Sequence, residues 1–136
     1  MYPTALSESG LHAALSGLAA RSALPVDLDY RPDRAPEPST ATAAYFIVAE
    51  AVTNAVKHSG AARVSVLVDE AGPGAGGPGG RPGLLVRVSD DGAGGADPAG
   101  TGLAGLADRA AAVDGRLTVH SPAGGPTVVF AELPCG

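Results

Sequence analysis

Residues 90–106 have the sequence Asp90-Asp91-Gly92-Ala93-Gly94-Gly95-Ala96-Asp97-Pro98-Ala99-Gly100-Thr101-Gly102-Leu103-Ala104-Gly105-Leu106, two glycine clusters separated by a short gap. The first cluster follows a carboxylate that ends a predicted strand. Glycine carries no side chain, so a flat or charged ligand can approach the backbone closely there. The second cluster opens onto an apolar-periodic helix, whose first N–H groups favour an anion such as phosphate. This stretch predicts a nucleotide site.

The composition predicts one globular domain with long loops. The chain has 136 residues, of which 45% are hydrophobic, and it contains 20 Gly and 12 Pro residues. Its net charge of −5 argues against a surface for duplex nucleic acid, which is usually basic. An anionic small ligand stays compatible with this charge, because a metal ion and a helix N-terminus can offset it.

The sequence also suggests where the protein works. Cys135 is the single cysteine, so no internal disulfide can form and a reducing compartment is expected. No apolar run reaches the length of a membrane span, and Met1 is not followed by the pattern of a signal peptide. We therefore expect a soluble, cytoplasmic domain without membrane contact of its own, and leave open a membrane anchor elsewhere in a full-length protein.

Hydrophobic periodicity predicts alternating helices and strands. Ser9 is the expected N-cap of the first helix, Ser39 or Thr40 that of the second, and Gly115 the left-handed cap of the third. Helices are expected at 9–22, 39–58 and 102–113, and strands at 26–30 (an edge strand), 64–68, 84–88 (leading to Asp90), 117–120 and 127–133. This order predicts an α+β fold, a two-layer α/β sandwich with a mixed sheet and helices on one face.

The long second helix carries a further group of polar residues. Its apolar stripe comprises Ala44, Ile47, Val48, Ala51, Val52 and Ala55. Glu50, Asn54 and then Lys57 or His58 line an adjacent stripe. An amide oxygen can ligate Mg²⁺, a carboxylate can orient or deprotonate a nucleophile, and a cation can balance phosphate. The alternative is a solvated helix face with a Glu–Lys pair.

Together, these motifs resemble the ATP-binding domain of bacterial sensor histidine kinases, in the GHKL superfamily that also holds gyrase, MutL and the heat-shock chaperone ATPases. Residues 44–59 resemble the N box, Asp90-x-Gly92-x-Gly94 the G1 box, and Gly100-x-Gly102-Leu103-x-Gly105-Leu106 the G2 box. Gly124-Gly125-Pro126-Thr127 resembles the terminal Gly-Gly-x-Thr. The likeness covers about residues 39–134. It implies the Bergerat fold and suggests the actinobacterial type that pairs with response regulators.

The resemblance implies ATP and Mg²⁺ as ligands and a role for each matched residue. Asp90 accepts a hydrogen bond from the adenine amino group, with Thr127 assisting, and Asn54 holds Mg²⁺. Glu50 is the catalytic base or orients the phosphate acceptor. The remaining ATP-binding residues are Lys57 and His58 near phosphate or ribose, Gly92 and Gly94 against the purine, and Gly100, Gly102 and Leu103 in the lid that covers the phosphates.

Each of these residues also has a simpler interpretation. Asp90 can be a turn residue after a strand, and His58 a cation favoured at a helix C-terminus. Lys57 can be a solvated lysine and Thr127 a strand-start residue. Two neighbours of the motifs are expected outside the site: Asp91 faces solvent, and His12 is a surface histidine without the phosphoacceptor pattern.

The glycines at 100, 102 and 105 also match the dinucleotide-binding pattern Gly-x-Gly-x-x-Gly. That fingerprint should follow a strand directly, and an acidic residue should stand about twenty positions later. Here a loop precedes it, and the next strand ends at His120-Ser121. A nucleoside triphosphate site is therefore a better hypothesis than a dinucleotide site.

The resemblance also implies a domain division, a function and partners for the chain. Residues 1–22 are predicted to be a connector from a missing dimerisation region, and residues 23–136 the kinase-like ATPase domain. The implied function is to bind Mg-ATP and donate the γ-phosphoryl to a histidine on a separate dimerisation domain, with a response regulator downstream and no nucleic acid. Two alternatives are a stand-alone serine/threonine kinase of the anti-sigma type and a degenerate module that binds protein without ATP.

Residues 71–83 and 95–101 are predicted to be mobile.

Overall fold

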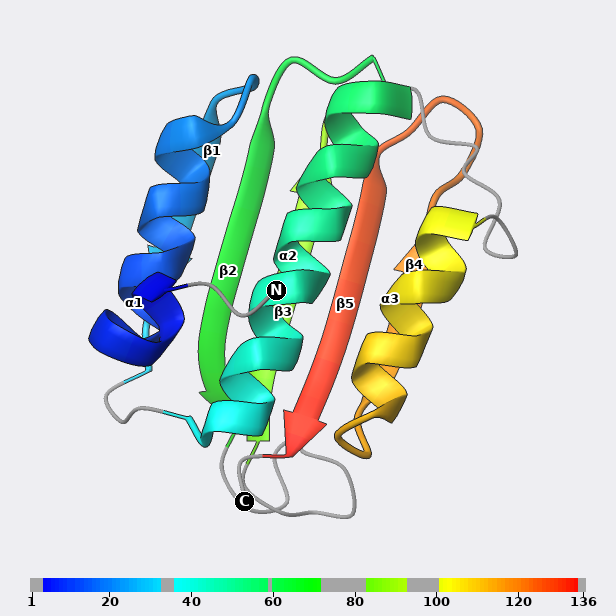
Figure 1. The fold of residues 1–136 in the computed structure, drawn as a ribbon. Helices are drawn as coiled ribbons and strands as arrows, with labels where there is room; N and C mark the ends of the chain where they lie inside the picture. The colour runs from blue at the N-terminus through cyan, green and yellow to red at the C-terminus, as the bar shows by residue number, and fades with distance from the viewer. Residues whose placement is uncertain (1–3, 33–35, 59, 72–82, 93–100, 135–136) are drawn as a thin grey trace.

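The computed structural model describes residues 4–32, 36–58, 60–71, 83–92 and 101–134. Within these ranges five strands form one sheet in the order β1-β2-β3-β5-β4. The strands are β1 (Val26–Tyr30), β2 (Val64–Ala71), β3 (Gly83–Asp90), β4 (Arg116–His120) and β5 (Thr127–Pro134). All three described helices, α1 (Thr4–Arg21), α2 (Pro38–His58) and α3 (Thr101–Ala111), cover the same face of this sheet (Figure 1). The predicted two-layer α+β sandwich is confirmed.

The sheet is mixed, as predicted. β1 pairs with β2 in parallel, and α2 makes the crossover between these two strands. The pairs β2–β3, β3–β5 and β4–β5 are antiparallel. β1 lies at one edge of the sheet, as its alternating sequence predicts. This order places the C-terminal end of β3 beside the N-terminal end of β5, where Asp90 is the register partner of Thr127.

The core lies between the helices and one face of the sheet. The predicted apolar stripe of α2 is buried throughout, and its most enclosed members are Ala44 and Ile47. α1 adds Leu11, Ala14 and Leu15, and α3 adds Leu106 and Ala110. The sheet contributes alternate residues, so the intervening side chains point to the opposite face, which no described helix covers.

The N-terminus of α2 differs from the prediction. The helix begins at Pro38, so Ser39 and Thr40 lie inside it and do not cap it. Proline suits the first helical position, because its missing N–H has no intrahelical acceptor there. The buried hydroxyl of Thr40 instead donates to the carbonyl oxygen of Pro134 at 2.8 Å. Thr40 therefore ties the start of α2 to the end of β5.

The predicted cap of α3 is also wrong. Asp114, and not Gly115, has the left-handed backbone conformation, with φ of 58°. Gly115 is needed for close approach, because an added Cβ would lie 2.6 Å from Leu133 Cδ2 and 2.8 Å from the Glu132 carbonyl oxygen. The N–H of Gly115 still donates to the carbonyl of Ala110 at 2.8 Å, as expected at a helix end.

α1 is longer than predicted and packs against the rest of the domain. It spans Thr4–Arg21 and is broken at Gly10, whose φ of 82° is not helical. Its described side chains join the core formed with α2 and the sheet. His12 is exposed, as expected, and its ring stacks on Tyr30 of β1 with centroids 4.4 Å apart. That residues 1–22 belong to a separate connector stays a prediction.

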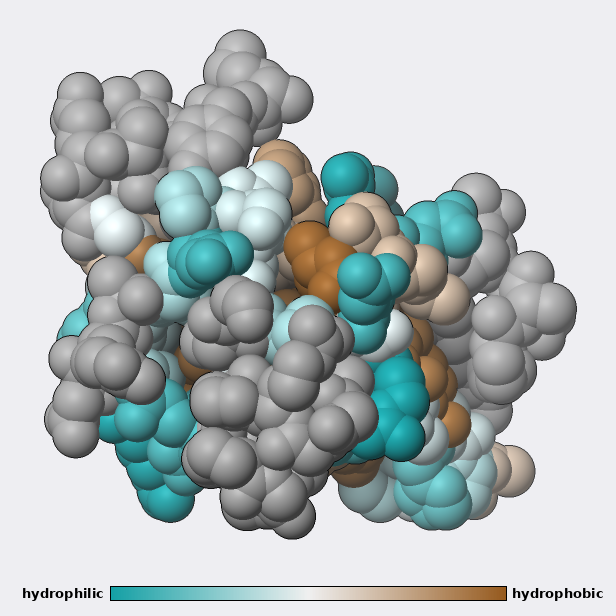
Figure 2. All heavy atoms as spheres, turned by 90° about the horizontal axis from the view of Figure 1, so that it is seen from below, coloured by the Kyte–Doolittle hydropathy of each residue, from teal (hydrophilic) through white to brown (hydrophobic). Residues whose placement is uncertain are grey.

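Hydrophobic and hydrophilic side chains are mixed over the surface at one end of the molecule. Figure 2 shows the end of the molecule that is lowest in Figure 1, where smaller hydrophobic patches lie between hydrophilic side chains. Among the described helices, none combines the length and hydropathy that crossing a membrane requires. The predicted mobile segments 71–83 and 95–101 fall largely outside the described residues.

Candidate functional site

The predicted site residues of the sheet lie at one end of its covered face. Asp90 ends β3, and Thr127 begins β5 beside it. Val88 and Val129, two positions away along each strand, are buried under the helices. Since side chains alternate along a strand, Asp90 and Thr127 point to the same covered side. The structure therefore brings these two predicted residues together.

Asp90 is the one buried carboxylate among the described residues, with 8% of its surface exposed. Its Oδ1 accepts a hydrogen bond from the N–H of Gly92 at 2.8 Å. This is the turn geometry that aspartate often adopts after a strand. The bond engages one carboxylate oxygen and fixes the side chain, so the turn role and a ligand-binding role are compatible.

Thr127 is half-buried and has a hydroxyl partner. Its Oγ1 lies 2.7 Å from Ser121 Oγ, across the loop between β4 and β5. A hydroxyl has one donor and two acceptor positions, so Thr127 can still bind a further polar group.

Glu50 and Asn54 lie on the side of α2 that faces α3. The Oε1 of Glu50 accepts from Arg109 Nε of α3 at 3.3 Å. The Oε2 of Glu50 lies against Gly105, where an added Cβ would be 3.1 Å away. Asn54 follows Glu50 by one helical turn and is half-buried. The carboxylate and the carboxamide therefore share one stripe, as the spacing predicts.

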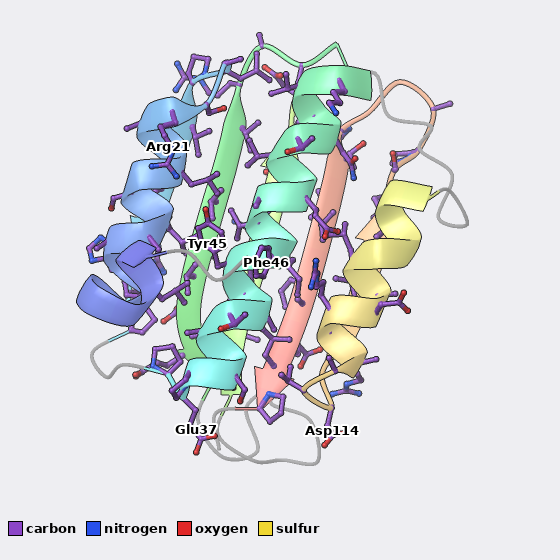
Figure 3. The ribbon with its side chains drawn as sticks, in the orientation of Figure 1. Arg21, Glu37, Tyr45, Phe46 and Asp114 are labelled. Carbon is purple, nitrogen blue, oxygen red and sulfur yellow. The ribbon has the colours of Figure 1, made fainter. Side chains whose placement is uncertain are left out.

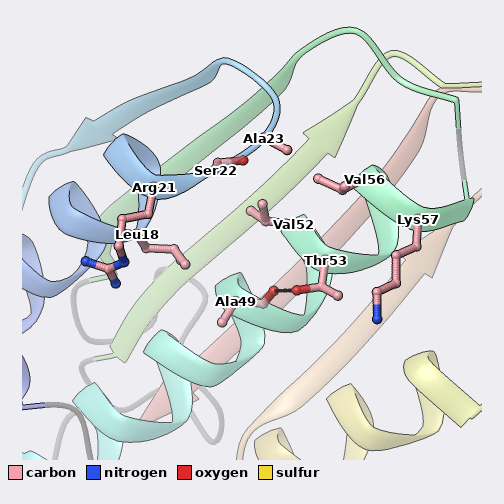
Figure 4. Close-up of a pocket in the computed structure, with 9 residues that line it drawn as sticks. All are labelled: Leu18, Arg21, Ser22, Ala23, Ala49, Val52, Thr53, Val56 and Lys57. Carbon is pink, nitrogen blue, oxygen red and sulfur yellow. Dashed lines mark hydrogen bonds between the residues drawn. The ribbon is translucent and has the colours of Figure 1, made fainter.

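Lys57 is exposed near the C-terminal end of α2. It contributes to a groove of about 240 Å³ between α1 and α2, whose apolar lining includes Leu18, Val52 and Val56 (Figure 4). Asp90, Glu50 and Asn54 do not line this groove. The contact of Lys57 with phosphate or ribose stays a prediction.

Some predicted residues cannot be placed fully. Gly94 and Gly100 lie outside the described residues. Gly102 and Leu103 lie in the first turn of α3, and His58 is the last residue of α2. The side chains of Leu103 and His58 lie outside the described part of the structure. α3 thus begins within the second glycine cluster and includes Gly102 and Gly105.

Asp91 has a structural role that the sequence did not reveal. Its Oδ1 accepts hydrogen bonds from the backbone N–H groups of Ala62 at 2.7 Å and Arg63 at 3.0 Å. These bonds hold the pKa of the Asp91 carboxyl below its ordinary value of 3.8. Asp91 is exposed, as predicted, and ties the connection between α2 and β2 to the end of β3.

The structure adds three residues that sequence reasoning did not assign to the site. Arg109 contacts Glu50 and lies over the ring of Phe46, with Cζ 4.6 Å from the centroid. Figure 3 labels Phe46 on α2, next to Tyr45, whose ring it meets edge to face. Phe46 and Arg109 line a groove of about 430 Å³ between the start of α2 and the end of α3. Gly105 was noted as part of a glycine motif, without its contact to Glu50.

Within the described residues, no group of three or more His, Cys, Asp or Glu side chains could hold a metal ion. Asn54 offers an amide oxygen, which is a ligand type that Mg²⁺ accepts. Magnesium bound with a nucleotide usually takes one or two protein ligands and completes its shell with phosphate oxygens and water. The residues present fit that arrangement.

Residues 40–136 match the family model of histidine kinase-, DNA gyrase B- and HSP90-like ATPases. The chain belongs to this family. The predicted GHKL membership is therefore confirmed, while the actinobacterial subtype is not tested. A search of curated proteins found no match.

Solved structures of histidine kinases have the same fold. The kinase domain of the blue-light activated histidine kinase from Erythrobacter litoralis matches with a TM-score of 0.62 and 22% identity, over 93% of this chain and 60% of that chain. The E. coli osmosensor EnvZ domain matches with 0.65 and 19% identity, over 93% and 86%. ShkA in complex with AMPPNP matches with 0.64 and 20% identity, over 91% and 29%. The chain thus spans about 60% of the first of these.

Proposed function

We propose that this domain binds Mg-ATP between α2 and α3, above the ends of β3 and β5, and donates the γ-phosphoryl to a histidine on a separate dimerisation domain. The observation that carries the proposal is the buried Asp90 carboxylate at the end of the covered face, in a family of ATPases. A buried carboxylate needs polar partners, and an adenine amino group is a donor that suits it. The likeness to histidine kinases, one of them in complex with the ATP analogue AMPPNP, supports ATP as the ligand.

The proposed roles follow the position of each residue. Asp90, assisted by Thr127, binds the adenine, and Gly92 and Gly94 let the purine lie against the backbone. Asn54 ligates Mg²⁺, which, when bound, offsets the charge of the phosphates. Lys57, His58 and the start of α3 with Gly100, Gly102 and Leu103 surround the phosphates and the ribose.

In the proposed transfer, the bond between the γ-phosphorus and its bridging oxygen breaks as a bond to an imidazole nitrogen of the partner histidine forms. ADP leaves, and Glu50 orients the imidazole or accepts its proton. The dimerisation domain that carries this histidine and the response regulator that later receives the phosphoryl group are proposed partners. A stand-alone serine kinase would give an acid-stable phosphoprotein, whereas phosphohistidine is acid-labile.

Calorimetric titration with Mg-ATP tests the binding proposal. We expect the wild-type chain to bind, and Asp90→Asn to weaken binding at least about tenfold, because the amide replaces a charged acceptor of the adenine amino group. Asn54→Ala should weaken the Mg²⁺ dependence of binding, because it removes the predicted metal ligand. Asp91→Asn is the matched control and should bind like the wild type.

One outcome would contradict the binding proposal, and a second would contradict its residue assignments. A folded wild-type chain that binds no Mg-ATP would support the alternative of a degenerate protein-binding module. Equal affinities in all four proteins would leave ATP binding standing and remove the residue assignments.

A further inference from the structure

Glu50 lies between α2 and α3, where a pair of residues on each helix faces a pair on the other. The helices lie side by side and run in opposite directions (Figure 1). α2 provides Phe46 and Glu50, four residues apart, and α3 provides Gly105 and Arg109 at the same spacing. Residues four apart share one face of a helix, so each pair presents a continuous surface to the other.

The two oxygens of the Glu50 carboxylate have different surroundings. Oε1 accepts from Arg109 Nε at 3.3 Å. Oε2 lies beside Gly105, one turn closer to the N-terminus of α3, where an added Cβ would be 3.1 Å away. A side chain at position 105 would displace the carboxylate by a few tenths of an ångström. Because Gly105 has no side chain, Oε2 has room toward the N-terminal end of α3, where the phosphates are proposed to bind.

Arg109 is itself fixed by a second contact. Its guanidinium carbon lies 4.6 Å from the centroid of the Phe46 ring. The side chains of Arg109 and Glu50 are 46% and 31% exposed, and an ion pair this exposed adds little stability. This cation–π contact restricts where the guanidinium lies, and so favours its hydrogen bond to Glu50.

We propose that Arg109 is a positioning residue, which holds the Glu50 carboxylate in the slot between α2 and α3 and offsets its negative charge beside the γ-phosphate of ATP. This inference rests on the proposed function, because it needs a nucleotide whose γ-phosphate lies near Glu50. Arg109 acts through Glu50 and touches no nucleotide. Gly105 provides the space on the opposite side of the carboxylate.

The test compares Mg-ATP with Mg-ADP, which lacks the γ-phosphate, by calorimetry on the full chain. Arg109→Gln leaves the Glu50 charge without compensation, so we expect ATP affinity to fall about three- to tenfold. ADP affinity should change less than about twofold, and this binding also shows that the variant is folded. Arg116→Gln, which removes an exposed arginine paired with Glu132 on the other face of the sheet, is the matched control and should change neither affinity.

A second comparison isolates Glu50. In a Glu50→Gln background, Arg109→Gln should cause no further loss of ATP affinity, because the charge that Arg109 offsets is already absent. Equal losses of ATP and ADP affinity, or the same loss in both backgrounds, would overturn the proposal and reduce Arg109 to a tie between helices. A wild-type chain that binds neither nucleotide would overturn the proposed function itself, and the role of Arg109 with it.

Discussion

The two faces of the sheet carry similar charged residues in different arrangements. On the open face, Asp27 pairs with Arg63 at 2.6 Å, Asp29 with Arg31 at 2.8 Å and Glu132 with Arg116 at 3.6 Å. On the covered side, Asp90 is buried and its described partner is a backbone N–H, while Glu50 lies between two helices and accepts a hydrogen bond from Arg109.

The difference separates carboxylates that are paired with arginine at the surface from Asp90, the one carboxylate that is buried among the described residues. Exposed ion pairs contribute little, and water replaces them at small cost. A buried carboxylate is expensive unless it is well bonded, so its presence at the end of a strand needs a reason beyond solubility. In this domain, the proposed reason is the ligand.

The largest expected effect compares adjacent leucines of β3, one on each face. Leu84 is 1% exposed in the core, whereas Leu85 is half-buried on the open face. Leu84→Ala should lower the free energy of unfolding by about 2–5 kcal/mol, because it leaves a cavity in a packed interior. Leu85→Ala should cost about 1 kcal/mol or less. Urea unfolding of both variants measures the difference, and equal losses would show that the open face is packed like a core.

Much of this division could be predicted from the sequence. The stripe from Ala44 to Ala55 gave the buried face of α2, and alternation gave the two faces of each strand. The order of the predicted elements gave the mixed sheet, and the family likeness, carried by four motifs in order, supplied the candidate site residues. These signals lie in local stretches of sequence.

The errors and omissions lie where distant segments meet. Thr40 bonds to Pro134, and Gly115 is required by Leu133 and Glu132, so neither role has a signal in nearby sequence. Glu50 and Arg109 are 59 residues apart, and only the packing of α3 on α2 brings them together. Tertiary contacts of this kind override local propensity.

A smaller effect is expected at Asp91, and it should depend on pH. The pKa of Asp91 is lowered in the folded chain by the N–H groups of Ala62 and Arg63, so its stabilising contribution is present above pH 3.8 and is lost as the pH falls through the folded pKa. Asp91→Asn should therefore unfold more easily than the wild type at pH 7, and this difference should shrink below about pH 3.8. Thermal unfolding between pH 3 and 7 measures it. A difference that is constant over this range would remove the charge from the explanation.

The smallest effect is expected on the open face. Arg116→Gln removes an exposed ion pair with Glu132, and the free energy of unfolding should change by less than about 0.5 kcal/mol. Urea unfolding in low and in high salt checks this value. A loss above about 1 kcal/mol that disappears in high salt would mean that the pairs of the open face act as a network.

The most direct test of the account is to map Mg-ATP on the domain by NMR, from the change in each backbone amide signal on titration. We expect the changes to gather at residues 50–57 of α2, at Asp90 to Gly92, at the start of α3 and at Thr127. Amides at the opposite end of the sheet, such as those of Glu70 and its register partner Leu84, should change little. Changes centred on that opposite end, or none at saturating Mg-ATP, would contradict the central claim that the nucleotide binds between α2 and α3.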